Sequence, residues 1–262
     1  SFLALTMGPF EQAEQYLGRA EQLAAGDTDP EGYAELSIVR CQMCTAQADF
    51  DSVVRYMDGV VTSSIKSGNQ HNLSLSLGHK AFSLILLNRY DEARQAADEA
   101  LRVAREQGDR PHEVMMLALV IPFIDIRDGR LEQALATAAE GFRLAQRIGA
   151  IDSLADSSFL RGEVLRQQGR YEEALAEAQR SQEAAALLES FLPFYSVHAL
   201  SLLGSVYLEI SDLFTDRVAQ FHGHALRLLE NPMGAMGGGI GWVDLGWCAL
   251  TLGDRELAAE LF

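Results

Sequence analysis

The sequence predicts an all-α protein, a right-handed superhelical solenoid of about seven antiparallel helical hairpins. Three observations lead to this prediction. A turn signature recurs about every 40 residues, small residues follow each signature at helical spacing, and Gly, Asn or Pro breakers separate the hairpins. Self-similarity at a fixed period in this range is typical of solenoids, in which each repeat packs only on its neighbours.

Each turn signature places a bulky anchor residue at the expected start of a helix. The anchors are Phe10, Phe50, Tyr90, Leu131, Tyr171, Leu213 and Arg255, spaced by 40, 40, 41, 40, 42 and 42 residues. A Gly, Asn or Asp before the anchor is expected to end the previous helix in a left-handed conformation. Acidic residues such as Asp91 and Glu92 follow the anchor, where they face the positive end of the helix dipole.

Small residues behind the anchors predict close packing between the two helices of a hairpin. They occupy equivalent slots on one helix face: Ala93, Ala97, Ala100 and Ala104, then Ala134, Ala138, Gly141 and Ala145, then Ala174, Ala178, Ser181 and Ala185. Short side chains along one stripe allow two helix axes to approach closely.

The helices that precede the anchors complete the hairpins. We expect them at residues 31–47, 70–87, 111–127, 151–167, 192–209 and 238–252, which predicts a single solenoid domain over residues 1–262. The chain starts without Met, and natural solenoids carry polar capping repeats at their ends. Residues 1–262 are therefore expected to be a fragment truncated at both ends. Its apolar end residues would allow self-association through the end hairpins: Phe2, Leu3, Leu5, Leu257, Leu261 and Phe262.

One group of residues resembles a known repeat family. The pattern of Gly162, Gly169, Tyr171, Ala174 and Ser181 is similar to a tetratricopeptide repeat, and Ala81, Tyr90, Ala93 and Ala100 repeat it. The usual repeat has about 34 residues, so the additional residues here lengthen the helices. The chain therefore looks like the longer, MalT-like variety found in large bacterial ATPase-linked transcriptional regulators. The resemblance implies a solenoid that binds other molecules, and it specifies no ligand because its motif residues are packing residues.

Charge argues against nucleic-acid and membrane partners. The chain carries 21 Lys and Arg against 37 Asp and Glu, a formal net charge of −16. Such a surface repels phosphate backbones and anionic lipid headgroups. The longest apolar run, residues 114–124, is far shorter than the roughly 20 residues that a membrane-spanning helix needs. We therefore expect a cytoplasmic protein that binds neither nucleic acid nor membranes through this segment.

Cysteine and histidine spacing does not complete a metal motif. Cys41 and Cys44 form a C-x2-C pair that lacks the second pair needed for zinc, so they are interpreted as buried, reduced thiols. His222 and His224 are two residues apart and would point to different helix faces, where solvent exposure is expected. His112 with Glu113 lacks the second His of a zinc-protease motif. No stoichiometric metal is expected.

The glycine-rich segment 233–241 does not match a phosphate-binding loop. It fits neither the dinucleotide-binding pattern nor a Walker motif, and it follows a helix instead of a strand. A turn between repeats is the better interpretation. With no complete motif in the sequence, we expect no catalytic residues, no cofactor and no enzyme activity.

A groove on the concave face is the candidate binding surface. In this fold the first helix of each hairpin lines that face, at positions 15, 12 and 8 residues before each anchor. The proposed groove comprises Leu75, Phe82, Met116, Leu119, Phe123, Phe159, Glu163 and Arg166, and the same counting reaches Gly78, Asp156, Ile240, Val243 and Trp247. These apolar residues either contact a ligand or form packed core. Acidic neighbours favour a ligand with some positive charge.

Three functional hypotheses follow. The first is a non-catalytic segment for protein–protein interaction or effector sensing, within a larger bacterial signalling or transcriptional regulator, that binds a protein, a peptide or a small-molecule effector. The second is a regulatory segment of a multidomain enzyme of the ATPase or nucleotide cyclase type. The third is a structural, self-associating scaffold.

Overall fold

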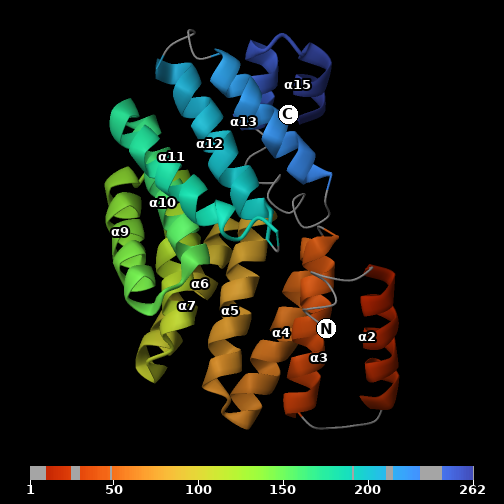
Figure 1. The fold of residues 1–262 in the computed structure, drawn as a ribbon. Helices are drawn as coiled ribbons and strands as arrows, with labels where there is room; N and C mark the ends of the chain where they lie inside the picture. Colours follow the sequence, from red (N-terminus) through yellow and green to blue (C-terminus); the bar gives the residue numbers. More distant parts are fainter. Residues whose placement is uncertain are drawn as a thin grey trace. The chain divides into compact units, whose positions relative to one another are not determined.

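The structure, a computed structural model, describes residues 10–24, 30–47, 49–190, 192–210, 215–230 and 244–261. Every secondary-structure element in these ranges is a helix, which confirms the all-α prediction (Figure 1). The chain divides into two compact units, residues 1–124 and 125–262. The single domain expected over residues 1–262 stays a prediction.

Unit 1 is a stack of helices in which each helix packs on the next. Its elements are α2 (Phe10–Ala24), α3 (Pro30–Ala46), α4 (Phe50–Ser67), α5 (Gln70–Leu86), α6 (Tyr90–Gln107), α7 (Arg110–Met115), the π-helix η1 (Met116–Val120) and the first half of α8 (Ile121–Arg127). Consecutive helices from α2 to α7 are in contact, as a solenoid requires. The largest apolar cluster joins α5 and α6 to η1 through residues such as Leu84, Ala97 and Val120.

Unit 2 repeats the same arrangement. Its elements after α8 are α9 (Leu131–Ile148), α10 (Ile151–Gln167), α11 (Tyr171–Ala186), α12 (Phe194–Ile210), α13 (Thr215–Leu229) and α15 (Arg255–Leu261), with residues 244–251 also helical. Helices α9, α10 and α11 lie side by side, and α12 packs on both α10 and α11 (Figure 1). No helix in the described ranges is both long and apolar enough to cross a membrane.

The predicted anchors mark the helix starts. Helices α2, α4, α6, α9, α11 and α15 begin at the anchors Phe10, Phe50, Tyr90, Leu131, Tyr171 and Arg255. The anchor Leu213 lies outside the described residues. Positive backbone φ values occur where the signatures require them, at Gly129 and Gly169 (φ 73° and 72°) and at Asn88 (φ 59°). These residues turn the chain because only Gly, and to a lesser degree Asn, adopts this conformation with little strain.

The small-residue stripes are buried, as predicted. Each Ala of the three stripes is at most 1% exposed, and Ser181 is equally buried. Two hydroxyl groups bridge the helices of a hairpin at this close approach. Ser74 Oγ donates to the backbone oxygen of Ala100 at 3.4 Å, and Ser181 Oγ donates to that of Ala155 at 2.9 Å. The two bonds join equivalent slots, but the hydroxyl comes from the first helix in one hairpin and from the second helix in the other.

One extra residue in unit 1 produces the π-helix. The spacing between the anchors Tyr90 and Leu131 is 41 residues, one more than in the three neighbouring repeats. Helices α5 and α10 each have 17 residues, whereas α7, η1 and α8 together cover 18. The N–H of Ile121 donates to the oxygen of Met116, five residues back, so the insertion is absorbed as a wide turn. Pro122, which has no N–H to donate, follows directly.

Candidate functional site

The predicted groove residues of unit 1 divide into half-buried and fully buried side chains. Leu75, Phe82, Leu119 and Phe123 keep part of their surface in contact with solvent. The rings of Phe82 and Phe123 also pack against the main apolar cluster of this unit. These two rings therefore belong to the edge of the core and still present a face that another molecule could contact.

Met116 is core, and the π-helix explains why. Its side chain is 0% exposed, whereas that of Met115 is partly exposed. Counting back from Leu131 crosses the inserted residue and reaches Met116. Counting six residues forward from the helix N-caps Asn69 and Asp109 reaches Leu75 and Met115 instead. Met115 is thus the structural equivalent of Leu75, and placing Met116 in the groove is a register error of one residue.

Gly78, the middle position predicted for this stripe, is buried. A Cβ atom added to Gly78 would come within 2.5 Å of Met115 Cε and 3.0 Å of Met116 Cε. The two methionine side chains therefore use the space that a side chain at position 78 would need, and this position is part of the packing between α5 and the segment from α7 to η1.

In unit 2 the predicted residues Asp156 and Phe159 are buried. Phe159 is 3% exposed, and its ring stacks on His198 with a centroid separation of 5.3 Å. Burial, followed by the nearby charge of Asp152, raises the pKa of Asp156 well above its usual range. Burial and the same two acidic residues raise the pKa of Tyr195. Phe159 belongs to the packed interior between α10 and α12 and offers no surface to a ligand in this conformation.

Glu163 and Arg166 form an ion cluster at the end of α10. Two guanidinium nitrogens of Arg166 donate to the two carboxylate oxygens of Glu163, each at 2.9 Å. Arg166 also lies 3.5 Å from Glu209 and 3.8 Å from Asp244. A single guanidinium thus faces three carboxyl groups drawn from α10, α12 and the helical residues 244–251. The predicted polar pair exists, but its charges are largely engaged within unit 2.

Asp244 is the least solvated acid of this cluster. Burial, together with the charge of Glu163, raises the pKa of Asp244 to about 6, against the opposing attraction of Arg166. The cluster therefore changes its charge near neutral pH. Sequence reasoning did not single out Asp244, because no motif surrounds it and its partners lie in other repeats.

Several other candidate residues are not brought together. Cys41 and Cys44 are buried free thiols, as predicted, and burial raises the pKa of Cys41 to about 12. His222 and His224 point to different faces, but the expected solvent exposure is wrong for His222. It is 6% exposed, because its face of α13 packs into unit 2. His224 Nε2 lies 3.2 Å from Glu189 Oε1.

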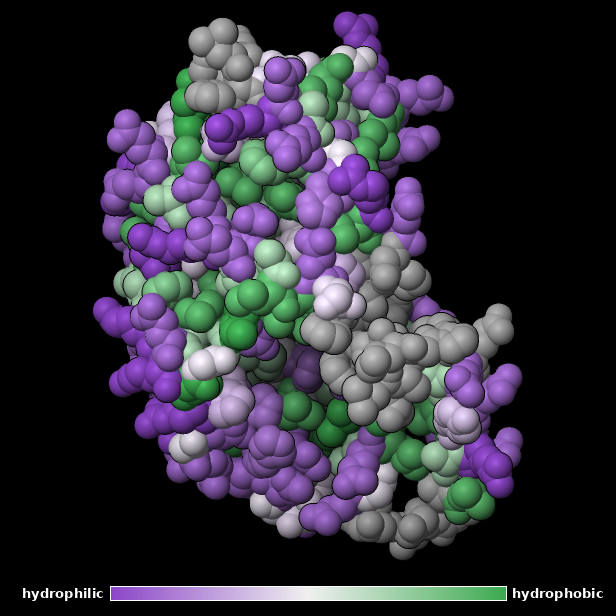
Figure 2. Space-filling view, in the orientation of Figure 1, coloured by the Kyte–Doolittle hydropathy of each residue, from purple (hydrophilic) through white to green (hydrophobic). Residues whose placement is uncertain are grey.

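Some predicted residues lie outside the described part of the chain. They are Phe2, Leu3, Leu5, the glycine-rich segment 233–241, Ile240, Val243 and Phe262. Trp247 is described, and it is 54% exposed. On the face shown in Figure 2, hydrophilic side chains alternate with separate hydrophobic patches.

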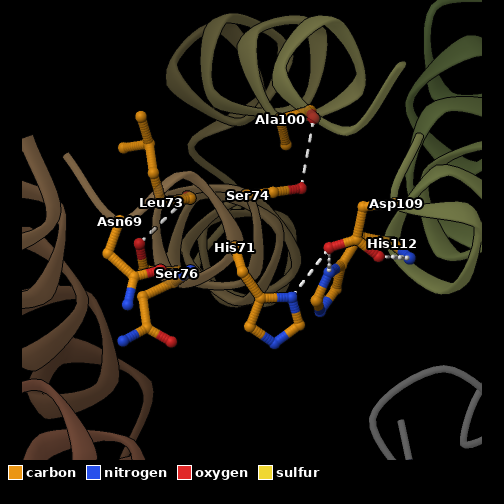
Figure 3. A network of polar contacts seen from close by, with 9 residues as sticks. Asn69, His71, Leu73, Ser74, Ser76, Ala100, Asp109 and His112 are labelled. Atoms are coloured by element: carbon orange, nitrogen blue, oxygen red, sulfur yellow. Dashed lines mark hydrogen bonds and ion pairs between the residues drawn. The ribbon is translucent and has the colours of Figure 1, made fainter. Parts of the chain in front are cut away.

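A histidine and carboxylate cluster in unit 1 was not predicted from the sequence. His71 Nδ1 and His112 Nδ1 each lie 2.8 Å from the same oxygen, Asp109 Oδ2 (Figure 3). Burial by itself raises the pKa of Asp109, but the hydrogen bonds from His112 and His71 outweigh it and hold the pKa below its usual value. Burial and the nearby His112 lower the pKa of His79 to about 4. The missed signal was the spacing, since His71 and Asp109 are 38 residues apart, close to one repeat.

Sequence comparisons are consistent with a helical repeat. The family model of anaphase-promoting complex subunit 5 matches residues 39–127, about a third of the chain. No curated protein matches the sequence.

Two solved structures have a similar fold. BtubC (BKLC) from P. vanneervenii matches with a TM-score of 0.50 and 17% sequence identity, over 96% of this chain and 86% of BtubC. A signal transduction ATPase with numerous domains (STAND) protein with a tetratricopeptide repeat sensor, from Pyrococcus horikoshii, matches with a TM-score of 0.59 and 17% identity. That match covers 96% of this chain and 38% of the STAND protein. At this level of identity the likenesses establish a tetratricopeptide-like helical repeat fold and nothing further.

Proposed function

We propose that this chain is a non-catalytic binding segment of a larger bacterial regulator, in which it recognises a protein or peptide or senses a small effector. The fold supports this proposal, because stacked helical hairpins present extended surfaces for binding. The STAND protein of similar fold carries a tetratricopeptide repeat sensor, and sensing is one of the roles proposed here. The repeat length of about 40 residues favours the MalT-like variety of the repeat. The free thiols Cys41, Cys44 and Cys248 favour a cytoplasmic setting.

The observation that carries the proposal is the pair of half-buried rings Phe82 and Phe123. They lie at equivalent positions, eight residues before the anchors Tyr90 and Leu131, and both belong to unit 1. A half-buried aromatic ring at the edge of a core is held in place by packing and loses little conformational freedom on binding. Leu75 and Leu119, also half-buried, extend the apolar surface. A peptide helix with spaced apolar side chains fits such a stripe.

The negative net charge of the chain favours a positively charged partner. Asp156 and Glu163 were expected to attract a basic ligand, but burial favours the neutral form of Asp156, and Glu163 is paired with Arg166. The net charge of −16 remains as a long-range field that speeds the approach of basic peptides. We therefore expect attraction to basic partners to be general, and to weaken as salt concentration increases.

Selection from a displayed peptide library tests the proposed stripe. The affinity of selected peptides is measured by calorimetry for the wild type, Phe82→Ala, Phe123→Ala and the control Ile65→Ala, whose side chain is exposed on α4. If the rings contact the peptide, each Phe variant loses about 2 kcal/mol of binding free energy, roughly 30-fold, while the control binds as the wild type does.

Thermal melting separates this outcome from a purely structural role. If the rings are only core, the same substitutions cost roughly 3–5 kcal/mol of stability, and peptides bind the folded variants with unchanged affinity. That result would contradict the proposed stripe.

The likeness to a STAND protein favours one second candidate, a regulatory segment of an ATPase. In this case the chain would restrain or release a nucleotide-binding domain in the same polypeptide. The sequence that flanks this segment in its gene distinguishes an ATPase from a transcriptional regulator. A P-loop upstream supports the ATPase role, and a helix-turn-helix downstream supports a transcriptional regulator.

A further inference from the structure

The starts of two successive hairpins in unit 1 bring two imidazoles and one carboxylate together. His71 lies in the first turn of α5, Asp109 is the N-cap of α7, and His112 lies in the first turn of α7. One potential ligand atom from each residue lies within 4.8 Å of the other two, the one such group of three among the described residues. The imidazole rings are 5.0 Å apart between centroids and tilted by 55°. Figure 3 shows both rings directed at the carboxylate of Asp109.

The two carboxylate oxygens of Asp109 accept hydrogen bonds from different groups. Oδ1 accepts the backbone N–H of His112 at 3.4 Å and so caps α7. Oδ2 faces both imidazole rings, each at 2.8 Å. The cap alone requires one oxygen, as at Asn69, whose Oδ1 accepts the N–H of Asn72 at the start of α5. Capping therefore explains the position of Asp109 but not the two histidines that converge on its second oxygen.

Neighbouring repeats lack this arrangement, so it is not a consequence of the fold. At the start of α10 in unit 2, the positions equivalent to Asp109 and His112 hold Ala150 and Ser153. The capping position of α5 holds Asn69, and three residues later stands Asn72. Two imidazole nitrogens and a carboxylate oxygen are ligands that Zn²⁺ and neighbouring divalent transition metals take in proteins.

We propose that His71, Asp109 and His112 bind one divalent transition-metal ion, with Zn²⁺ as the test ion. Ligand atoms around such an ion, at about 2.0–2.2 Å from it, stand roughly 3.0–3.5 Å from one another. The two separations between an imidazole Nδ1 and Asp109 Oδ2, 2.8 Å each, therefore need to open by about half an ångström. The side chain of His71 is 67% exposed and can make this movement, while Asp109 and His112, each 11% exposed, are held by packing.

The ion replaces the two protons that now lie between the imidazole Nδ1 atoms and Asp109 Oδ2. A carboxylate oxygen only accepts, so each Nδ1 that bonds to Asp109 carries its proton. On binding, each neutral imidazole carries its proton on Nε2 and presents the lone pair of Nδ1 to the ion. Three protein ligands leave coordination positions for water or for a carboxylate or imidazole of a bound partner. Glu113, beside the cluster, is engaged by Arg105 and Arg110 and is not a ligand.

The experiment is a competition titration of Zn²⁺ against a chromogenic chelator, using the metal-free 262-residue chain. The ligand field absorption of bound Co²⁺ serves as a second measurement. We expect one equivalent to bind the wild type, and His71→Ala and Asp109→Asn each to weaken it by at least about 10-fold. Asn retains the capping oxygen, so helix α7 is preserved in the Asp109 variant. His224→Ala, which removes a partly exposed histidine in unit 2, is the matched control and should bind normally.

Two results would overturn the proposal. One is the absence of Zn²⁺ binding at micromolar concentration, which would leave the three residues as a hydrogen-bonded helix cap. The other is binding that persists in His71→Ala and Asp109→Asn but is lost in Cys41→Ser, which would place the ion at the thiols. A positive result replaces the expectation, drawn from motifs alone, that this segment binds no stoichiometric metal.

Discussion

Asp156 and Asp244 are acidic residues of unit 2 whose carboxyl groups lie largely out of water. Burial raises the pKa of both, because a charged carboxylate loses more solvation energy than a neutral acid. Asp244 retains one cationic neighbour, Arg166, which limits the shift. Asp156 has instead a second acid, Asp152, beside it. At the scale of single residues, the environment thus shifts both carboxyl groups toward the neutral form, which their residue type alone does not suggest.

Asp244 makes the stability of unit 2 depend on pH. Its folded pKa of about 6 lies above the ordinary value of 3.8, so the folded state binds the proton more tightly. The cost of burying the charge is present at pH 7 and is relieved as the pH falls through about 6. When the pH falls from 7 to 5, protonation of this group should raise the free energy of unfolding of the wild type by about 1 kcal/mol relative to that of Asp244→Asn. Urea unfolding of both proteins at the two pH values measures the difference, and parallel pH dependence would contradict the assignment.

At the scale of the elements, end residues set where helices stop, and one inserted residue sets the side-chain register within a helix. Gly68 ends α4 with φ 73°, and its N–H donates to the oxygen of Ser64, which closes the last turn. The π-helix η1 shows how an insertion that leaves both neighbouring turns intact changes the register of side chains inside a helix. The consequence reaches the candidate site, because the insertion buries Met116 and leaves Met115 partly exposed.

Two glycines of unit 1 should respond in opposite ways to the same substitution. Neither Gly68 nor Gly18 has an atom within 4 Å of an added Cβ, so steric contact is absent at both. Gly68→Ala places a side chain at φ 73° and should destabilise the protein by about 1 kcal/mol. Gly18→Ala lies within helix α2 and should stabilise it by roughly 0.5–1 kcal/mol, since Ala favours the helix. Thermal melts of the two variants decide, and equal shifts would show that the backbone conformation is not the cause.

At the scale of the whole molecule, local packing determines the stability and net charge determines which partners are attracted or repelled. Most contacts run from each helix to the next within a unit, so stability is expected to be close to a sum over neighbouring helices. The net charge of −16 acts over the entire surface and keeps anionic polymers away.

The effect of this net charge can be tested by measuring nucleic-acid binding. With no net positive charge, the release of counterions that drives such binding has no source. We expect no measurable association with random-sequence duplex DNA at physiological salt in fluorescence anisotropy. Micromolar binding under these conditions would show that a local basic surface outweighs the net charge.

The sequence by itself determined the repeat period, the helix starts and the buried stripes of small residues. These features are local, because a left-handed cap, an anchor and an Ala three residues later act within one turn of chain. The interior position of Phe159, the ion cluster of Arg166 and the meeting of His71 with Asp109 were decided only by the tertiary structure. Each joins residues from different repeats, and a shift of one residue, as at η1, changes which side chains face each other. Sequence spacing indicates which residues lie in adjacent repeats, but only the packing of the helices decides whether their side chains meet.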